Sequence, residues 1–288
     1  MDPMITITTS PAMRTFVGDA RRAGKRIGFV PTMGFLHEGH LSLIRKARER
    51  TELVVVSIFV NPTQFGPQED FDKYPRDREM DDGLCRAERV AALFVPVADE
   101  MYAVDRSVWV DETGLSRGLC GASRPGHFRG VATVVAKLFN IVQPDVAVFG
   151  MKDAQQLRVI QRMTRDLDFP VEIVACPTVR EPDGLAMSSR NKYLSDIERA
   201  EAMAINRGLS AAERLYDAGE RSAVVLGGAV ERSLAEEPGL EQEYVEVVDF
   251  GSLQPVTEAV GPTLIAVAAR VGGTRLIDNV LLGVNGEW

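Results

Sequence analysis

Short apolar runs alternate with amphipathic stretches over roughly the first 175 residues of the chain. The run 53–60 is apolar and largely β-branched on both faces, as expected of a strand that helices cover on both sides. Residues 41–48 instead repeat apolar positions at helical spacing, with arginine and lysine between them. By the same reasoning, strands are predicted at 27–30, 91–95, 146–149 and 171–175, and helices at 131–142 and 155–167.

This order of elements predicts the fold class. Strands that alternate with helices form right-handed βαβ units around a parallel sheet. We therefore predict an α/β fold whose main part is a Rossmann-like, doubly wound parallel sheet. The GxGxxG fingerprint does not follow the first predicted strand, which removes the main sequence support for dinucleotide binding.

The pattern changes after residue 178. A long helix rich in alanine, glutamate and arginine is predicted at 195–217, and a second helix at 223–235. Strands are predicted at 244–249, 264–271 and 276–282, the last two around the turn Gly272-Gly273. We therefore predict two domains, a Rossmann-like domain at 1–178 and a smaller α+β C-terminal domain at 179–288.

Composition and charge restrict the kinds of partner that this protein can bind. The chain has 288 residues, 45 % of them hydrophobic, and a formal charge of −8 from 33 basic and 41 acidic residues. This balance argues against disorder and against a nucleic-acid surface. No apolar run reaches the length of about 18 residues that a membrane span requires, and the N-terminus lacks the pattern of a signal peptide. We expect a cytoplasmic protein without a membrane partner, and free buried thiols at Cys85, Cys120 and Cys176.

Polar clusters directly follow four of the predicted strands. They occupy residues 31–40, 61–65, 150–153 and 177–191. In an open parallel sheet the carboxyl ends of the strands face one crevice. We therefore expect these four clusters, which are far apart in sequence, to contribute to one site.

The cluster at 31–40 contains two histidines at the start of a predicted helix. His37 and His40 are three residues apart, so their rings project to one side, and the helix N-terminus adds a partial positive charge. Gly34 and Gly39 allow the backbone to approach a ligand closely. This combination favours a phosphate cradle flanked by imidazoles. A zinc site would need a third ligand, which His127 or a carboxylate could supply, and a purely structural role of both histidines is the other alternative.

The other clusters supply charge and neutral amides. Lys152 places a point charge at a strand end, and Ser188-Ser189-Arg190 offers two hydroxyls and a guanidinium suited to phosphate. Gln64 and Gln156 could bind carboxylate or hydroxyl groups without adding charge. Asp81, next to Asp82, matters only if the chemistry uses Mg²⁺, as ATP chemistry does. Lys152 and the two aspartates are also compatible with ordinary solvated positions, and Ser188-Ser189-Arg190 with a polar loop between domains.

Several motifs carry a family resemblance. The stretch Pro31-Thr32-Met33-Gly34-x-x-His37-x-Gly39-His40 resembles the HxGH signature of the nucleotidyltransferase superfamily, which class I aminoacyl-tRNA synthetases share. Five further motifs, from about residue 57 to residue 194, are similar in order and content to the pantothenate synthetase (pantoate–β-alanine ligase) family. They are Ser57-Ile58-Phe59-Val60-Asn61-Pro62-Thr63-Gln64-Phe65, Tyr74-Pro75-Arg76, Arg124-Pro125-Gly126-His127-Phe128-Arg129-Gly130-Val131, Lys152-Asp153-x-Gln155-Gln156-Leu157 and Arg180-Glu181-x-Asp183-Gly184-Leu185-Ala186-Met187-Ser188-Ser189-Arg190-Asn191-x-Tyr193-Leu194.

The resemblance implies a two-step ligation in which ATP and pantoate give pantoyl adenylate, and β-alanine then displaces AMP. It implies a Rossmann domain with a C-terminal lid, a cytoplasmic homodimer, and Asp81 as the residue associated with Mg²⁺. Catalytic roles fall on His37, His40, Lys152 and Arg190, with His40 as proton donor, and pantoate or β-alanine contacts fall on Asn61, Gln64 and Gln156. The ATP contacts that it implies are Met33, Gly34, His37, Gly39, His40, Gly150, Met151, Lys152, Asp153, Val179, Met187, Ser188, Ser189 and Arg190.

One position departs from the family, and two other functions remain open. The family has glutamate where this chain has Met151, so any polar role at that position is in doubt. A different nucleotidyltransferase, acting on a phosphorylated substrate, would share the HxGH loop but would not need the Gln64 and Gln156 amides. A catalytically silent nucleotide-binding module would not need Lys152, His40 and Arg190 together.

Overall fold

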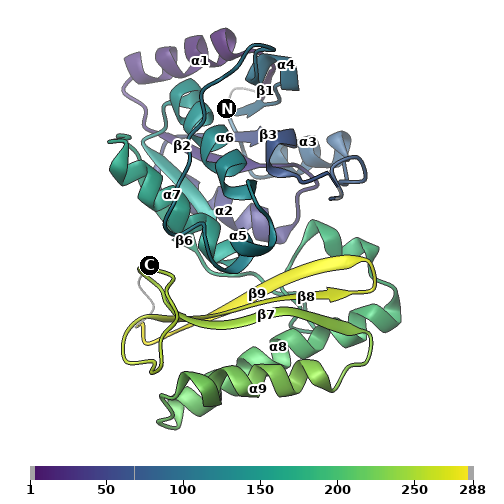
Figure 1. The fold of residues 1–288 in the computed structure, drawn as a ribbon. Coiled ribbons are helices and arrows are strands. Elements are labelled where there is room, and N and C mark those ends of the chain that lie inside the picture. Colours follow the sequence, from purple (N-terminus) through teal and green to yellow (C-terminus); the bar gives the residue numbers. More distant parts are fainter. Residues whose placement is uncertain (1–3, 68, 285–288) are drawn as a thin grey trace. The chain divides into compact units, whose positions relative to one another are not determined.

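The computed structural model describes residues 4–67 and 69–284, which form two compact units (Figure 1). The first unit contains the chain up to residue 114, together with 124–151 and 156–177. The second unit contains 115–123, 152–155 and the chain from residue 178 onward. Within the described residues, no helix has the length and the apolar composition needed to cross a membrane.

The first unit is built on a six-stranded sheet. Its strands lie in the order β1-β4-β3-β2-β5-β6, and every pairing is parallel. The predicted parallel, doubly wound sheet is therefore confirmed. In chain order the strands are β1 (Ile5–Ile7), β2 (Ile27–Thr32), β3 (Leu53–Ile58), β4 (Ala92–Phe94), β5 (Val146–Gly150) and β6 (Glu172–Cys176).

Helices cover both faces of this sheet. α1 (Ser10–Arg22) and α6 (His127–Val142) pack on each other and on β2, whereas α2 (Glu38–Arg50) contacts β2, β3 and β5. The connection from β1 to β2 and the connection from β2 to β3 run in opposite directions across the sheet, so right-handed crossovers place α1 and α2 on opposite faces. The other helices near this sheet are α3 (Arg78–Ala87), α4 (Ala98–Met101) and α7 (Ala154–Asp166).

The central strands are buried on both faces, as expected for the apolar run 53–60. All of Leu53 to Ser57 is buried, and so are the first four residues of β2. The strand ends at Ile58, two residues earlier than predicted, because the chain turns at Asn61 into the short 3₁₀ helix η1 (Pro62–Gln64). Pro62 has no N–H to continue a ladder, which fits this end.

The strand order reverses direction between β2 and β5. The crossover after β2 leads to β3 on one side, and the crossover after β5 leads to β6 on the other side. Such a switch point leaves a crevice at the carboxyl ends of the two strands, where ligands bind in folds of this class. β2 runs into the turn that precedes α2, and β5 runs into the 3₁₀ helix η2 (Met151–Asp153). Two of the predicted polar clusters therefore begin at the switch point.

The second unit pairs a three-stranded antiparallel sheet with two helices. The sheet has the order β7-β8-β9, from β7 (Leu240–Asp249), β8 (Thr263–Val271) and β9 (Thr274–Leu282), and α8 (Asp196–Asp217) and α9 (Ala223–Ala235) lie along one face (Figure 1). Their shared core is aliphatic, with Ile205, Leu226 and Val230 almost completely buried. Short helices α5 (Leu119–Ser123) and η3 (Ser189–Tyr193) complete the unit.

The predicted elements of this unit are confirmed, although its three strands begin earlier than expected: β7 by four residues, β9 by two and β8 by one. α9 has the predicted bounds, and Val271 pairs with Thr274 around the turn at Gly272, whose φ of 55° favours glycine. β7 begins at Leu240 instead of residue 244. A register shift between Gln242 and Tyr244 breaks the alternation there, so the first part of the strand carries no period-2 signal.

Candidate active site

The turn between β2 and α2 has an unusual backbone. Gly34 and Phe35 both have left-handed conformations, with φ values of 84° and 51°. The Gly34 N–H donates to Thr32 Oγ1 (3.1 Å), and that hydroxyl donates to the carbonyl of Ser57 on β3 (2.7 Å). A Cβ atom at position 34 would lie 2.9 Å from Cγ2 of Ile58, so glycine is required by space as well as by φ. The turn places His37 as the N-cap of α2.

The two histidines form a stacked pair at the start of α2. Their ring centroids are 4.1 Å apart, and the rings are tilted by 44°. The His37 N–H donates to Nδ1 of His40 (3.3 Å). Because Nδ1 accepts, neutral His40 carries its proton on Nε2, an assignment that follows from the hydrogen-bond partner. His40 therefore presents an N–H donor beside the positive end of the helix dipole.

A cluster of neutral polar groups lies at the end of β3. Gln64, in η1, is 9 % exposed, and its Oε1 accepts a hydrogen bond from Asn61 Nδ2 (3.0 Å). Its Nε2 is 3.4 Å from the sulfur of Met33, which is a weak acceptor. Tyr102 fixes Asn61 from the other side, because its hydroxyl donates to Asn61 Oδ1 (2.7 Å). The structure thus brings together three predicted site residues, Met33, Asn61 and Gln64.

The backbone of Gln64 is held by a charged brace that the sequence reasoning did not identify. We use this term for Glu69, Arg124 and His127. Arg124 binds both carboxylate oxygens of Glu69 at 2.6 Å and also donates to the carbonyl of Gln64 (3.3 Å). Burial by itself would raise the pKa of Glu69, but the hydrogen bonds and charge of Arg124 lower it to about 2. The carboxylate is therefore ionised throughout the physiological range.

His127 completes the brace in a defined protonation state. Its Nδ1 is 2.8 Å from the carbonyl oxygen of Gln64, so Nδ1 carries the proton. Its Nε2 is 3.1 Å from Nη1 of Arg124, which can only donate, so Nε2 accepts and the imidazole is neutral. The only sequence signal for these contacts is the motif 124–131, whose individual roles its pattern does not reveal. His127 is committed to Gln64, which removes it as a third zinc ligand.

Lys152 belongs to the second unit, where charged groups surround it. Its carbonyl accepts a hydrogen bond from Asn279 Nδ2 (3.0 Å). Burial lowers the pKa of the Lys152 ammonium, the charge of Asp153 opposes this, and Arg190 lowers the pKa further. Asp278, only 4 % exposed, is ion-paired with Arg180 through Nη1 and Oδ2 at 2.6 Å. Phosphate oxygens would relieve the repulsion between the Lys152 and Arg190 cations.

The remaining predicted residues of the second unit lie in one loop. The Met187 N–H donates to the carbonyl of Val179 (3.0 Å), and this pairing folds 179–187 back on itself. Ser188 then caps η3, because its hydroxyl accepts the N–H of Arg190 (3.3 Å). Ser189 is 6 % exposed. The structure therefore places Val179 and Met187 to Arg190 in one loop of the second unit.

Four further predicted residues lie at the ends of these elements. Gly39 is in the first turn of α2, Gly150 is the last residue of β5, Asp153 ends η2, and Gln156 is in the first turn of α7. Met151 is 4 % exposed. A thioether can fill this space without a charge to desolvate, so position 151 contributes packing in this chain.

Asp81 does not fit the role of a magnesium ligand. It is 2 % exposed, and its two carboxylate oxygens accept the N–H groups of Phe35 (2.9 Å) and Leu36 (2.7 Å). Burial raises the pKa of its carboxyl, and these two hydrogen bonds oppose the rise. Mg²⁺ in proteins keeps several of its waters, whereas Asp81 is buried and both of its oxygens already accept backbone N–H groups. Across residues 4–67 and 69–284, no group of three or more His, Cys, Asp or Glu side chains is arranged to hold a metal ion.

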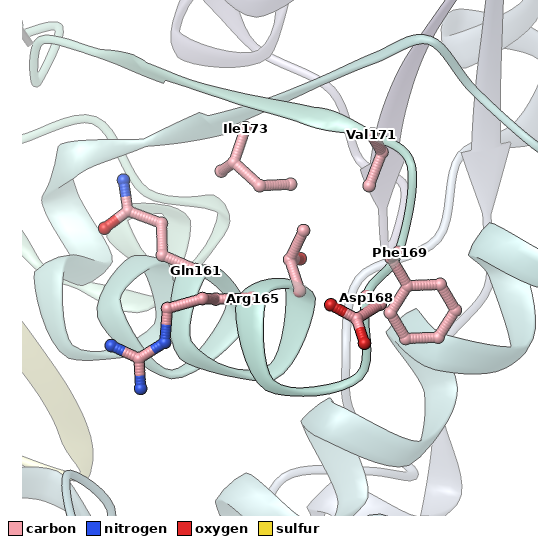
Figure 2. Close-up of a pocket in the computed structure, with 7 residues that line it drawn as sticks. Gln161, Arg165, Asp168, Phe169, Val171 and Ile173 are labelled. Atoms are coloured by element: carbon pink, nitrogen blue, oxygen red, sulfur yellow. The ribbon is translucent and has the colours of Figure 1, made fainter.

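A hollow of about 490 Å³ lies elsewhere on the first unit (Figure 2). Phe169 and Val171 precede β6, so the hollow lies at the amino end of that strand, away from the carboxyl ends at which the predicted residues gather. No predicted site residue is among those that line it, which are Gln161, Thr164, Arg165, Asp168, Phe169, Val171 and Ile173.

Burial keeps two of the three cysteines, Cys85 and Cys176, in the thiol form. All three are free and buried, as expected. Burial raises the pKa of Cys176 to about 11 and that of Cys85 to about 12. Both therefore hold their protons at neutral pH, when the reactive thiolate would be needed.

A doubly wound parallel sheet with a glycine turn and His37-x-Gly39-His40 at its switch point places this chain in the class of α/β proteins that carry an HxGH motif. The chain belongs to the pantoate-beta-alanine ligase family, whose family model matches residues 5–281. It is 55 % identical to the pantothenate synthetase of Thermotoga petrophila, over 97 % of this chain and 100 % of the relative. It is 54 % identical to the Moorella thermoacetica protein of the same name, over 98 % and 100 %.

Solved structures agree with this assignment. The pantothenate synthetase of Thermus thermophilus superposes with a TM-score of 0.93 at 45 % identity, over 98 % of this chain and 100 % of that chain. The pantoate-beta-alanine ligase of Francisella tularensis, in complex with β,γ-ATP and β-alanine, superposes with a TM-score of 0.81 at 33 % identity, over 96 % and 97 %. The family suggested by the motifs and the predicted fold class are thereby confirmed.

Proposed function

We propose that this chain condenses pantoate and β-alanine to pantothenate at the expense of ATP, through a pantoyl adenylate. The observation that carries the proposal is the cluster of Met33, Asn61 and Gln64 beside the His37–His40 turn. A phosphate-binding helix start next to neutral amides suits a substrate that is a carboxylic acid and not a phosphate ester. Family membership and the ATP and β-alanine bound to the Francisella relative support it.

The first step joins two anions. A pantoate carboxylate oxygen attacks the α-phosphorus of ATP, a new P–O bond forms, and the bond to the bridging oxygen of pyrophosphate breaks. Charge grows on the phosphoryl oxygens and on the leaving group, so catalysis depends on positioned donors and cations. In the second step the β-alanine amine attacks the activated carbonyl, AMP leaves with the carboxylate oxygen, and the nitrogen loses a proton to solvent.

The first unit is proposed to bind pantoate and part of ATP. Gln64 would direct its Nε2 to the pantoate carboxylate or hydroxyl, because its present partner, the Met33 sulfur, is easily exchanged for a stronger acceptor. Gln156 and Asn61 would complete the pantoate contacts, and Gln64 would also border β-alanine. His40 is the proposed proton donor, through Nε2. The other ATP contacts proposed here are Met33, Gly34, His37, Gly39, Gly150 and Met151.

The second unit is proposed to bind phosphate oxygens with its cations. Lys152 and Arg190 repel each other, so an anion between them gains from both. Further ATP contacts are proposed for Asp153, Val179, Met187, Ser188 and Ser189. Much of the acceleration would come from holding the carboxylate in line with the α-phosphorus.

The proposal also covers the metal ion, the compartment and oligomeric state of the protein, and the role of the C-terminal domain. Mg²⁺ would enter bound to the phosphates of ATP, where it commonly keeps several waters, and Asp81 would not be its ligand. We propose that the chain acts in the cytoplasm as a homodimer. We also propose that the C-terminal domain, 179–288, limits hydrolysis of the adenylate by covering it.

The test traces a carboxylate oxygen of pantoate into AMP. Pantoate carrying ¹⁸O in its carboxylate is incubated with ATP, Mg²⁺ and β-alanine, and the AMP is analysed by mass spectrometry. We expect one ¹⁸O in AMP and a dependence of AMP release on both pantoate and β-alanine. Unlabelled AMP would exclude the adenylate. Pyrophosphate release with phosphopantetheine or a nicotinamide nucleotide but not with pantoate would indicate another nucleotidyltransferase, and no pyrophosphate with any acceptor would indicate a silent module.

A further inference from the structure

Two adjacent carboxylates on α3 have different surroundings. Asp82 faces outward and pairs with Arg78 (2.5 Å) and Arg86 (3.8 Å). Asp81 faces inward, where its two oxygens each accept one N–H of the turn that precedes α2. Cys85, one helical turn further along α3, is also fully buried, so this face of the helix packs inside the protein. The two residues are alike in sequence but differ in their contacts.

The turn whose amides Asp81 binds has an unfavourable backbone conformation. Phe35 has a side chain and yet adopts a φ of 51°, directly after Gly34 at 84°. Left-handed conformations are unfavourable for residues with a Cβ and persist where the surroundings fix them. Successive N–H groups in such a turn point to one side and suit an anion. Asp81 supplies that anion from within the protein, with its Oδ2 also 3.0 Å from where a Cβ of residue 34 would lie.

We propose that Asp81 is a positioning residue that fixes the turn 34–36, and with it the start of α2, in the geometry that receives ATP. This inference rests on the proposed function, because ATP is taken to bind the Met33–His40 segment. A metal ligand would need an oxygen turned toward the nucleotide and water around it. Asp81 is buried and its oxygens are directed at Phe35 and Leu36, so it acts through the backbone of the turn and not on the substrate.

Asp81→Asn separates the two roles. An asparagine can accept one of the two N–H groups, but its own NH₂ opposes the other, so the turn is disturbed without a change of volume. We expect kcat/KM for ATP to fall about 10- to 100-fold, while the Mg²⁺ concentration that gives half-maximal rate stays within about twofold of the wild-type value. Asp82→Asn, the matched control, is expected to change neither quantity. A rise of the Mg²⁺ requirement in Asp81→Asn that parallels the loss of rate would overturn the proposal.

Two further measurements do not depend on ligase activity. Hydrogen exchange of the Phe35 and Leu36 amides, followed without substrates, is expected to be faster in Asp81→Asn than in Asp82→Asn and the wild type. A second substitution, Phe35→Gly, removes the steric cost of the left-handed φ, so it is expected to restore part of the ATP affinity of Asp81→Asn, measured by titration with a non-hydrolysable ATP analogue. Unchanged exchange at both amides would refute the positioning role, even in a variant that remains folded.

These outcomes are separable from failure of the proposed function. If wild-type protein forms no labelled AMP from pantoate, the proposed reaction is wrong, but exchange and nucleotide titration still report on the turn. If Asp81→Asn does not fold, the double variant with Phe35→Gly carries the test, because it relaxes the same turn. An unfolded double variant would show that Asp81 stabilises more than the turn and would overturn the assignment.

Discussion

The brace of Glu69, Arg124 and His127 permits a quantitative prediction. We consider Glu69→Gln, which keeps the size of the side chain but removes its charge. The Arg124 guanidinium, whose side chain is 15 % exposed, then loses its counter-ion and one of its two charge-assisted hydrogen bonds. A buried charge left without its partner destabilises a protein more than the loss of an exposed ion pair does.

The magnitude follows from the pKa of Glu69. A fall from the ordinary value of 4.5 to about 2 corresponds to about 3 kcal/mol of stabilisation of the charged form by the folded protein. The Glu69 side chain is 26 % exposed, so solvent screening reduces this figure. We expect Glu69→Gln to lower the free energy of unfolding of the first unit by about 2 kcal/mol at pH 7.

Denaturant unfolding at several pH values provides the assay. Because the folded-state pKa is depressed, the contribution of Glu69 is complete above pH 4.5 and is lost as the pH falls toward 2. The difference between wild type and Glu69→Gln should therefore be constant from pH 7 to 5 and shrink below pH 4.5. Glu79→Gln on α3, an acidic residue for which no ion pair is described, is the control. A difference that does not vary with pH would refute the electrostatic origin.

The brace also predicts a kinetic effect. Arg124 and His127 both bind the carbonyl of Gln64, so a loosened Arg124 displaces the residue proposed to bind pantoate. We expect Glu69→Gln to raise KM for pantoate severalfold and to leave KM for ATP nearly unchanged. Equal increases in both constants would show that the brace supports the unit in general and does not position Gln64.

Three further predictions concern single residues. His40→Ala should abolish most pyrophosphate release while the circular dichroism spectrum stays that of the wild type; normal adenylate formation would remove its proposed role. Gln64→Ala should raise KM for pantoate at least tenfold, about 1.4 kcal/mol for one lost hydrogen bond, with nucleotide binding unaffected. Gly130→Ala should lower Tm and pantoate affinity together, because the added Cβ would lie 2.4 Å from the Thr63 carbonyl oxygen, whereas Gly83→Ala, with open space around it, should do neither. Similar Tm values for the two alanine variants would contradict this account.

Much of the fold could be predicted because buried helices and strands leave a recognisable pattern of apolar residues in the sequence. β3 is apolar on both faces and α9 has a clear apolar stripe, and both lie where the pattern predicts them. α1 was missed, although Met13, Val17 and Ala20 recur at helical spacing, because that stripe is narrow and the rest of the helix is polar. α3 was missed because its inward face contains Asp81, which a hydrophobic pattern does not count as buried.

Individual residues of the candidate site could be predicted from the sequence, but the contacts between them could not. The residues of the His37–His40 turn follow one strand and can be recognised from their residue types. The brace cannot be recognised in this way, because Glu69 and Arg124 are 55 positions apart and each resembles an ordinary surface charge. The inward orientation of Asp81 and the outward orientation of Asp82 depend on the rotation of α3, which a pair of identical neighbours does not reveal.

The second unit is not a single stretch of chain, and this bears on how the protein can be divided or synthesised. Residues 115–123 and 152–155 belong to it although they precede residue 178. They are joined within the unit, since Gln155 Nε2 donates to the carbonyls of Leu115 and Gly118 at 2.8 Å, and Lys152 accepts from Asn279. A fragment that starts at residue 178 would lack these partners, including the Lys152 carbonyl that accepts from Asn279. During synthesis, these two segments must therefore wait for β9, which is made after both of them, before the unit that contains Lys152 is complete.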